Sequence, residues 1–136
     1  MMQRHEPLQR RLPVEFLKIV LLAVLAAVVY GIVHDQITAR VCVEYFTVAH
    51  PPVFHTDSPT LLGLGWGVIA TWWVGFILGV PAAALARWGK APKLAAKDLI
   101  GPMGVLLGAM ALCALVAAGT GGPTLQACSS VPALIS

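Results

Sequence analysis

The sequence predicts an all-α membrane protein with three transmembrane helices. Of its 136 residues, 58% are hydrophobic and only 11% are charged, whereas a soluble domain is about half apolar and about a quarter charged. Three apolar runs, at 16–33, 61–86 and 99–118, are close to or above the roughly 20 residues that cross a bilayer as a helix. The chain outside these runs is divided into short segments, of which 34–60 is the longest, and this excludes a sizeable soluble catalytic domain.

The first apolar run follows a polar and basic flank at 1–15. The run at 16–33 contains one charge, Lys18, whose side chain can extend back to the headgroups. A basic flank before an apolar run also describes a signal peptide, but this run is long for one and no clean cleavage site follows it. We therefore expect an uncleaved first span.

The segment at 34–60 is the most polar internal part of the chain. It lacks Gly and Pro up to Ala49, so we expect the first helix to continue to about that residue. Ser58 and Pro59 form a typical helix start, with Ser as N-cap and Pro in the first turn. The expected segments are a flank at 1–15, a span at 16–33, an outer polar segment at 34–60, a span at 61–86, a basic loop at 87–98, a span at 99–118 and a tail at 119–136.

Lys and Arg are distributed unevenly between the two ends of these spans. Only Arg40 lies in the outer segment, and none lies in the tail. Basic residues stay in the cytoplasm, so the positive-inside rule predicts a multi-pass protein of the bacterial inner membrane with a cytoplasmic N-terminus. The eight other basic residues all fall on the cytoplasmic side: Arg4, Arg10, Arg11, Lys18, Arg87, Lys90, Lys93 and Lys97.

Small residues recur at every fourth position of the second span. In lipid, such a ridge lets two helix backbones approach closely. We favour packing within the chain against the third span, which carries Gly104, Gly108, Ala111, Ala114 and Ala118, and a homo-oligomer or partner interface is the alternative. The ridge consists of Gly63, Gly67, Thr71, Gly75, Gly79 and Ala83.

The outer segment holds three of the four histidines and three of the six acidic residues. Imidazole and carboxylate groups suit a divalent metal ion, and the candidate ligands are His34, His50, His55 and Asp57. Their spacing matches no metal motif, so a solvated polar loop is the favoured interpretation and no cofactor is expected. The candidate functional residues are His34, Asp35, Arg40, Glu44, Tyr45 and His50.

Two pairings are expected in the same region. Arg40 and Glu44 are four residues apart and would pair on a helix face. Cys42 and Cys128 both lie on the outer side, where an oxidising compartment permits a disulfide, although two unpaired thiols are the alternative that we favour. Cys113 lies in the third span and is expected to be a packing residue.

The stretch YGIVHDQITARVCVEYFTVAHPP, residues 30–52, resembles a segment of a family of small bacterial integral membrane proteins without known biochemistry. It covers about a sixth of the chain. The resemblance implies a fourth span that is missing from this chain, whose C-terminus would then be truncated or altered. It also implies a site on His34-Asp35-Gln36, Arg40, Glu44-Tyr45-Phe46-Thr47 and His50-Pro51.

Three functions remain open, and none involves nucleic acid, because the net charge of +3 comes from residues that flank the spans. The leading interpretation is a non-enzymatic accessory or assembly subunit whose partners are the lipid bilayer and other membrane helices. The first alternative is a small metal-binding or ion-handling protein that uses the outer segment. The second is a membrane enzyme built on His34, Asp35 and Glu44, although no catalytic motif is present.

The topology can be tested by labelling one engineered cysteine. Thr56→Cys, in a chain whose native cysteines are replaced by alanine, is expected to react with a membrane-impermeant maleimide added to the outer side, because the Lys and Arg asymmetry places 34–60 outside. A cysteine that reacts only from the cytoplasmic side would contradict this orientation.

Overall fold

A computed structural model describes residues 6–88, 92–121 and 128, with backbone only for 6–12. The described residues form helices and no strands. Three helices are long and apolar enough to cross a membrane, which confirms the predicted all-α fold with three spans. The elements in chain order are α1 (Glu6–Val41), α2 (Glu44–Thr47), α3 (Pro59–Arg87) and α4 (Ala96–Gly119).

The first helix is longer than the apolar run that predicts it. It extends backwards into the polar flank and forwards to Val41, where it ends. The expectation that it continues to about Ala49 is therefore wrong, since the chain leaves the helix at Cys42 and forms the separate turn α2. The start of α3 is as predicted, with Ser58 at the N-cap and Pro59 in the first turn.

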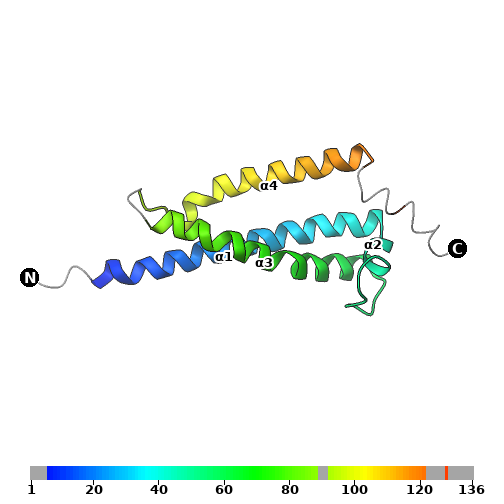
Figure 1. The fold of residues 1–136 in the computed structure, drawn as a ribbon, viewed down its shortest axis with the longest axis horizontal. Helices are drawn as coiled ribbons and strands as arrows, with labels where there is room; N and C mark the ends of the chain where they lie inside the picture. The colour runs from blue at the N-terminus through cyan, green and yellow to red at the C-terminus, as the bar shows by residue number, and fades with distance from the viewer. Residues whose placement is uncertain (1–5, 89–91, 122–127, 129–136) are drawn as a thin grey trace, which may run out of the picture.

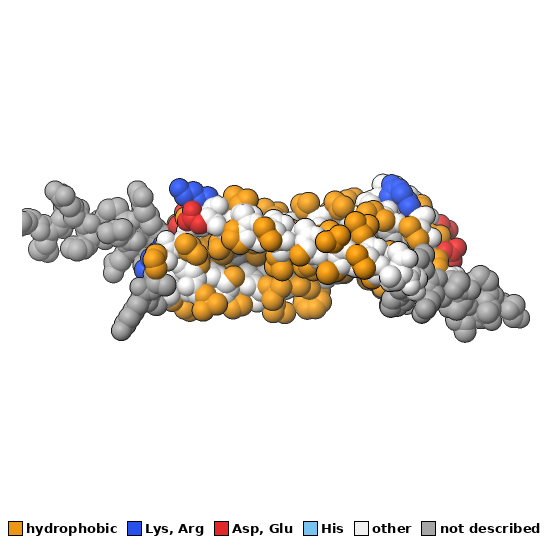
Figure 2. Space-filling view, turned by 90° about the horizontal axis from the view of Figure 1, so that it is seen from above, with side chains coloured by type: hydrophobic (Ala, Val, Ile, Leu, Met, Phe, Trp, Pro, Cys, Tyr) orange, Lys and Arg blue, Asp and Glu red, His pale blue; other side chains and the backbone are white. Residues whose placement is uncertain are grey.

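Two of the spans form a tight pair, and the third stands apart from it. Figure 1 shows α1 and α3 side by side and antiparallel. We call the end of the molecule where α1 ends and α3 begins the outer end, after the expected orientation, and the opposite end the inner end. The fourth helix, α4, diverges from the pair toward the outer end. Apolar side chains cover the middle of the molecule, and charged side chains gather at its two ends (Figure 2). This distribution fits a helical pair that crosses the apolar core of a bilayer and carries its charge at the two surfaces.

The small-residue ridge of α3 packs on α1. A Cβ added at Gly67 would lie 2.5 Å from the Cα of Ile32, and one added at Gly75 would lie 2.6 Å from the Cα of Val24. No side chain fits at either distance, so the two backbones touch only because glycine stands there. The expectation of packing within the chain is correct, but the partner is the first span and not the third.

The first helix presents a matching row of small residues to this ridge. Ala23 lies against Gly75 and Gly79, and Ala27 lies against Gly75. Gly31 leaves room for the side chain of Thr71. The Thr71 hydroxyl donates to the carbonyl of Gly67 in its own helix, which removes its unpaired donor from the lipid. The contact therefore combines close packing of small residues with a satisfied polar group.

The fourth helix touches the pair mainly at its inner end. Leu99 and Ala96 pack against a buried cluster that contains Ile19 and Ala83. The N–H of Ala96 donates to Glu15 of α1 over 3.4 Å. The described part of the chain buries no residue of α4. Side chains added at its four glycines would meet no described atom within 4 Å: Gly101, Gly104, Gly108 and Gly119.

The helix contact is tested by adding a branched side chain on and off the ridge. Gly67→Ile is expected to destabilise the protein by about 1–3 kcal/mol or more, because it forces two backbones apart. Val68→Ile is the matched control, since Val68 is exposed on the same helix, and it should stay within about 0.5 kcal/mol of the wild type. Thermal unfolding in detergent measures both, and equal melting shifts would contradict the packing.

Candidate functional site

The candidate functional residues all lie at the outer end of the molecule. This end consists of the last two turns of α1, the short helix α2, the loop at 48–58 and the first turns of α3 (Figure 1). A small buried core of Ala39, Phe46 and Leu62 joins these three helices. We call residues 42–58, which this core fixes onto α1 and α3, the outer cap.

His34 and Asp35 form a local pair. The Nδ1 of His34 lies 3.1 Å from a carboxylate oxygen of Asp35, and the imidazole stacks at 6.1 Å on the ring of Tyr30. No hydrogen bond or ion pair among the described side chains joins this pair to Glu44, which lies beside Cys128 at 3.9 Å. The three residues named for a membrane enzyme are thus divided between two places.

Arg40 connects α1 to α3. One guanidinium nitrogen donates to the carbonyl and side-chain oxygens of Gln36 at 2.7 and 2.6 Å, and the other donates to the Thr60 hydroxyl at 3.2 Å. Gln36 itself donates to the Thr60 carbonyl at 2.8 Å. The expected pair with Glu44 is not formed, because α1 ends between the two residues and they no longer share a helix face.

A disulfide joins Cys42, directly after α1, to Cys128 in the tail. Their Cα atoms are 5.8 Å apart, within the range of a native bridge. The favoured expectation of two unpaired thiols is therefore wrong, and the alternative, a disulfide, is present. Cys113 is free and exposed on α4. The disulfide ties the chain that follows α4 back to the outer end of α1.

His50 is enclosed by aromatic rings. Its Nδ1 lies 2.7 Å from the carbonyl of Tyr45, which can only accept, so the imidazole donates there. Its ring centre lies 4.5 Å from that of Tyr45, 5.9 Å from that of Phe46 and 4.8 Å from that of Trp66. The geometry assigns His50 a structural role, in which it fixes the cap loop onto α3.

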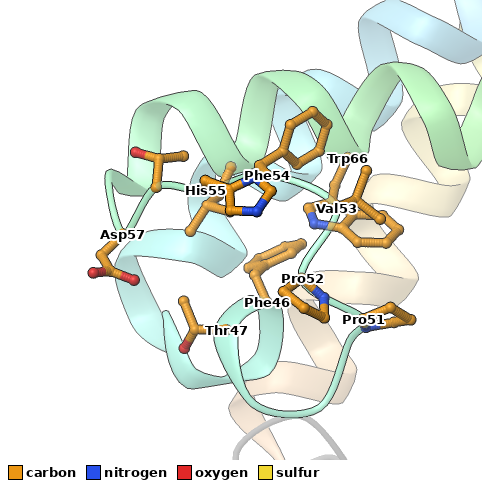
Figure 3. A pocket seen from close by; sticks show the side chains of 11 residues that line it. Phe46, Thr47, Pro51, Pro52, Val53, Phe54, His55, Asp57 and Trp66 are labelled. Atoms are coloured by element: carbon orange, nitrogen blue, oxygen red, sulfur yellow. The ribbon is translucent and has the colours of Figure 1, made fainter.

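A pocket of about 260 Å³ lies between the cap loop and the first turns of α3. Its lining comes from α2, from the loop and from α3 (Figure 3). We call it the cap pocket, and its lining residues are Phe46, Thr47, Pro51, Pro52, Val53, Phe54, His55, Thr56, Asp57, Leu62 and Trp66.

The four candidate metal ligands are not assembled into one site. His55 and Asp57 line the cap pocket, while His50 is held by aromatic rings and His34 pairs with Asp35. Within the described ranges, one group of three metal-ligating side chains has all its donor atoms within 4.8 Å: Cys42, Glu44 and Cys128. Both cysteines of that group are in the disulfide, which removes their thiolates as ligands. Metal binding by the segment 34–60 stays the alternative interpretation.

Three residues of this region are not among the candidates from the sequence. Thr60 holds Arg40 together with Gln36, which the resemblance had included. Phe54 and Trp66 form the inner wall of the loop. The Phe54 ring lies where a side chain on Gly65 would stand. Gly65 stands next to Trp66 near the start of an apolar span, and this pair is the sequence signal that could have indicated that an aromatic ring packs there.

Comparison with known proteins adds no relative. No family model, no curated protein and no solved structure matches this chain. The function proposed below is therefore argued from the geometry of the chain itself.

The disulfide is tested by counting free thiols. Protein taken from intact cells and alkylated without reduction is expected to carry the label at Cys113 alone, with Cys42 and Cys128 recovered as one cross-linked peptide. Reduction before alkylation is the control and should expose all three. Free, alkylatable thiols at Cys42 and Cys128 in the unreduced sample would contradict the bridge.

Proposed function

We propose that this chain is a non-enzymatic assembly subunit of the membrane that associates with a second copy of itself through α4. The observation that carries the proposal is the contrast between the glycines of α3 and those of α4. Gly67 and Gly75 lie against the backbone of α1, whereas Gly104 and Gly108 meet nothing within 4 Å.

Glycine inside a helix destabilises the helix by about 1 kcal/mol relative to alanine, because it loses more backbone freedom on folding. A close packing contact at the glycine can compensate for this loss of stability. In α3 the compensation is the close contact with α1. In α4 no contact with the described residues of the chain supplies it, which favours a contact from outside the chain.

The open face of α4 is suited to an identical partner. From Leu99 to Gly119 the helix carries no charged side chain, so recognition depends on shape and dispersion rather than on polar pairing. Gly104 and Gly108 form a small-xxx-small pair, the pattern that lets two equal helices cross closely in lipid. Two copies related by a two-fold axis present the same face to each other, so the assembly is complete as a dimer.

The proposed location is the bacterial inner membrane, with a cytoplasmic N-terminus and the outer cap on the other side. Two independent features support this orientation. In the sequence, eight of the nine basic residues fall in the segments 1–18 and 87–98, and one falls in the segment 34–60. The disulfide belongs to the cap end, and such bonds persist in an oxidising compartment such as the periplasm.

Self-association is tested with a cysteine on each side of α4. Leu115 and Cys113 are two positions apart on an α-helix and so lie about 200° apart, with Leu115 on the same face as Gly104 and Gly108. Leu115→Cys combined with Cys113→Ala is expected to form cross-linked dimers when membranes are oxidised with copper phenanthroline. Native Cys113 should cross-link much less.

A second measurement separates assembly from folding. Gly108→Ile is expected to convert the dimer to monomer in nanodiscs, as read by native mass spectrometry, while the melting temperature stays near that of the wild type, because nothing in the chain is displaced. A wild-type protein that is monomeric at all concentrations, or equal cross-linking at both positions, would overturn the proposal.

A further inference from the structure

The cap pocket combines apolar walls with one charged group. Its apolar lining includes the partly exposed rings of Phe54 and Trp66 and the exposed side chains of Pro52 and Val53. Polar groups of Thr47, His55 and Thr56 complete the lining. Asp57 is the one residue of its lining that carries a formal charge at neutral pH. In Figure 3 the Asp57 carboxylate stands on the opposite side of the pocket from Pro51 and Trp66.

The Asp57 carboxylate has no partner of its own among the described side chains. It is exposed, and neither an ion pair nor a hydrogen bond engages it within the ranges 6–88 and 92–121. His34, Arg40 and His50 of the same end are bound to Asp35, to Gln36 with Thr60, and to Tyr45. His55 lines the pocket together with Asp57, and no hydrogen bond or ion pair joins these two side chains within the described ranges. A cationic ligand would complement this carboxylate.

We propose that the cap pocket binds a small organic ammonium ion, with its alkyl groups against the aromatic wall and its positive charge beside Asp57. Aromatic faces attract alkylammonium ions through their quadrupoles, and this attraction grows as the ion loses water. A nearby carboxylate adds direct attraction. The proposal does not depend on self-association through α4, which lies elsewhere in the molecule.

A bare metal ion fits this pocket less well than an ammonium ion. Calcium requires about six to eight oxygen ligands, and the lining offers one carboxylate, two threonine hydroxyls and one imidazole among mainly apolar side chains. An alkylammonium ion needs no such ligand set, because its methyl or methylene groups take up apolar wall. The composition of the lining thus favours an organic cation.

Contacts within the chain hold the wall of the pocket in position. Phe54 packs on Gly65, its ring lies 6.0 Å from that of Trp66, and His50 is held by the Tyr45 carbonyl. A pre-formed wall avoids the loss of freedom that ordering a loop would add to binding. The volume of about 260 Å³ is below the range of drug-sized sites, about 300–1,000 Å³, and suits a headgroup-sized ligand.

The same ammonium chemistry is available from a free solute and from a lipid headgroup. The pocket borders the first turns of α3, where this helix would leave the bilayer. Choline and tetramethylammonium represent the free solute, and phosphatidylcholine presents the same group at the membrane surface. The lipid composition around the protein therefore distinguishes the two sources.

The test is calorimetric titration of the full chain in nanodiscs of phosphatidylglycerol, which has no ammonium group. Tetramethylammonium chloride and choline are expected to bind saturably above a sodium chloride control. The neutral analogue of choline, with carbon in place of nitrogen, should bind at least about tenfold more weakly, because it has the shape without the charge.

Variants identify the pocket as the place of binding. Asp57→Asn keeps the size of the side chain and is expected to weaken choline binding by about tenfold or more. Asp35→Asn removes an acid of the same end that lies outside the pocket, and it should leave binding unchanged. Unaltered melting temperatures verify that both variants are folded.

The remaining outcomes decide the source of the ligand and the fate of the proposal. Weaker choline binding in phosphatidylcholine nanodiscs than in phosphatidylglycerol nanodiscs identifies the lipid headgroup as occupant, and equal binding identifies the free solute. The proposal is overturned by an absence of saturable binding, by binding that Asp57→Asn does not weaken, or by calcium or zinc binding more tightly than choline in the same titration.

Discussion

The contact between the backbones of α1 and α3 determines how the rest of this structure is arranged. At Gly67 and Gly75 the two helices approach until no side chain fits between them. In lipid, where apolar side chains gain nothing from leaving the solvent, such close packing is the main attraction between spans. The antiparallel register that it imposes places Gly63 beside Asp35 and Gly79 beside Ala23. Each end of α3 thereby receives a defined neighbour on α1.

The outer cap depends on that register. Gln36 and Arg40 reach Thr60 only because the end of α1 stands beside the start of α3. The same alignment brings Leu62 against Ala39 and closes the small core beneath the loop. The hydrogen bonds and the disulfide then secure an arrangement that the glycine contact has already produced. The polar groups of Gln36, Arg40 and Thr60 are paired with one another, so this end offers a polar surface without leaving those groups unpaired.

Sequence reasoning recovers the parts of this fold that follow from periodicity and composition. The three spans, the glycine ridge of α3 and the start of α3 can be predicted because each is a local pattern in the sequence. The helix that packs on the ridge cannot be predicted in this way, since a row of small residues identifies a packing face but not the helix that contacts it. The row on α1, Ala23, Ala27 and Gly31, was available in the sequence, but the small residues of the third span gave an equally good match.

The candidate site is less predictable for a different reason. The residue types were found, yet their partners depend on where α1 stops. A helix that continued past Val41 would have placed Arg40 and Glu44 on one face, whereas the break at Cys42 turns Glu44 toward the disulfide. The cap pocket depends further on the path of a loop that contains Pro51 and Pro52, whose conformation no periodic pattern describes.

The separation of α4 from the helical pair has a structural consequence for assembly. Its inner end is anchored by Leu99 against the buried cluster with Ile19 and by the bond from Ala96 to Glu15. Beyond its outer end, the disulfide at Cys128 ties the chain back to Cys42. A helix that is fastened at both ends does not need lateral packing to stay with its own chain. Its open face can therefore exchange lipid for a protein neighbour while the α1–α3 contact and the outer cap remain as they are.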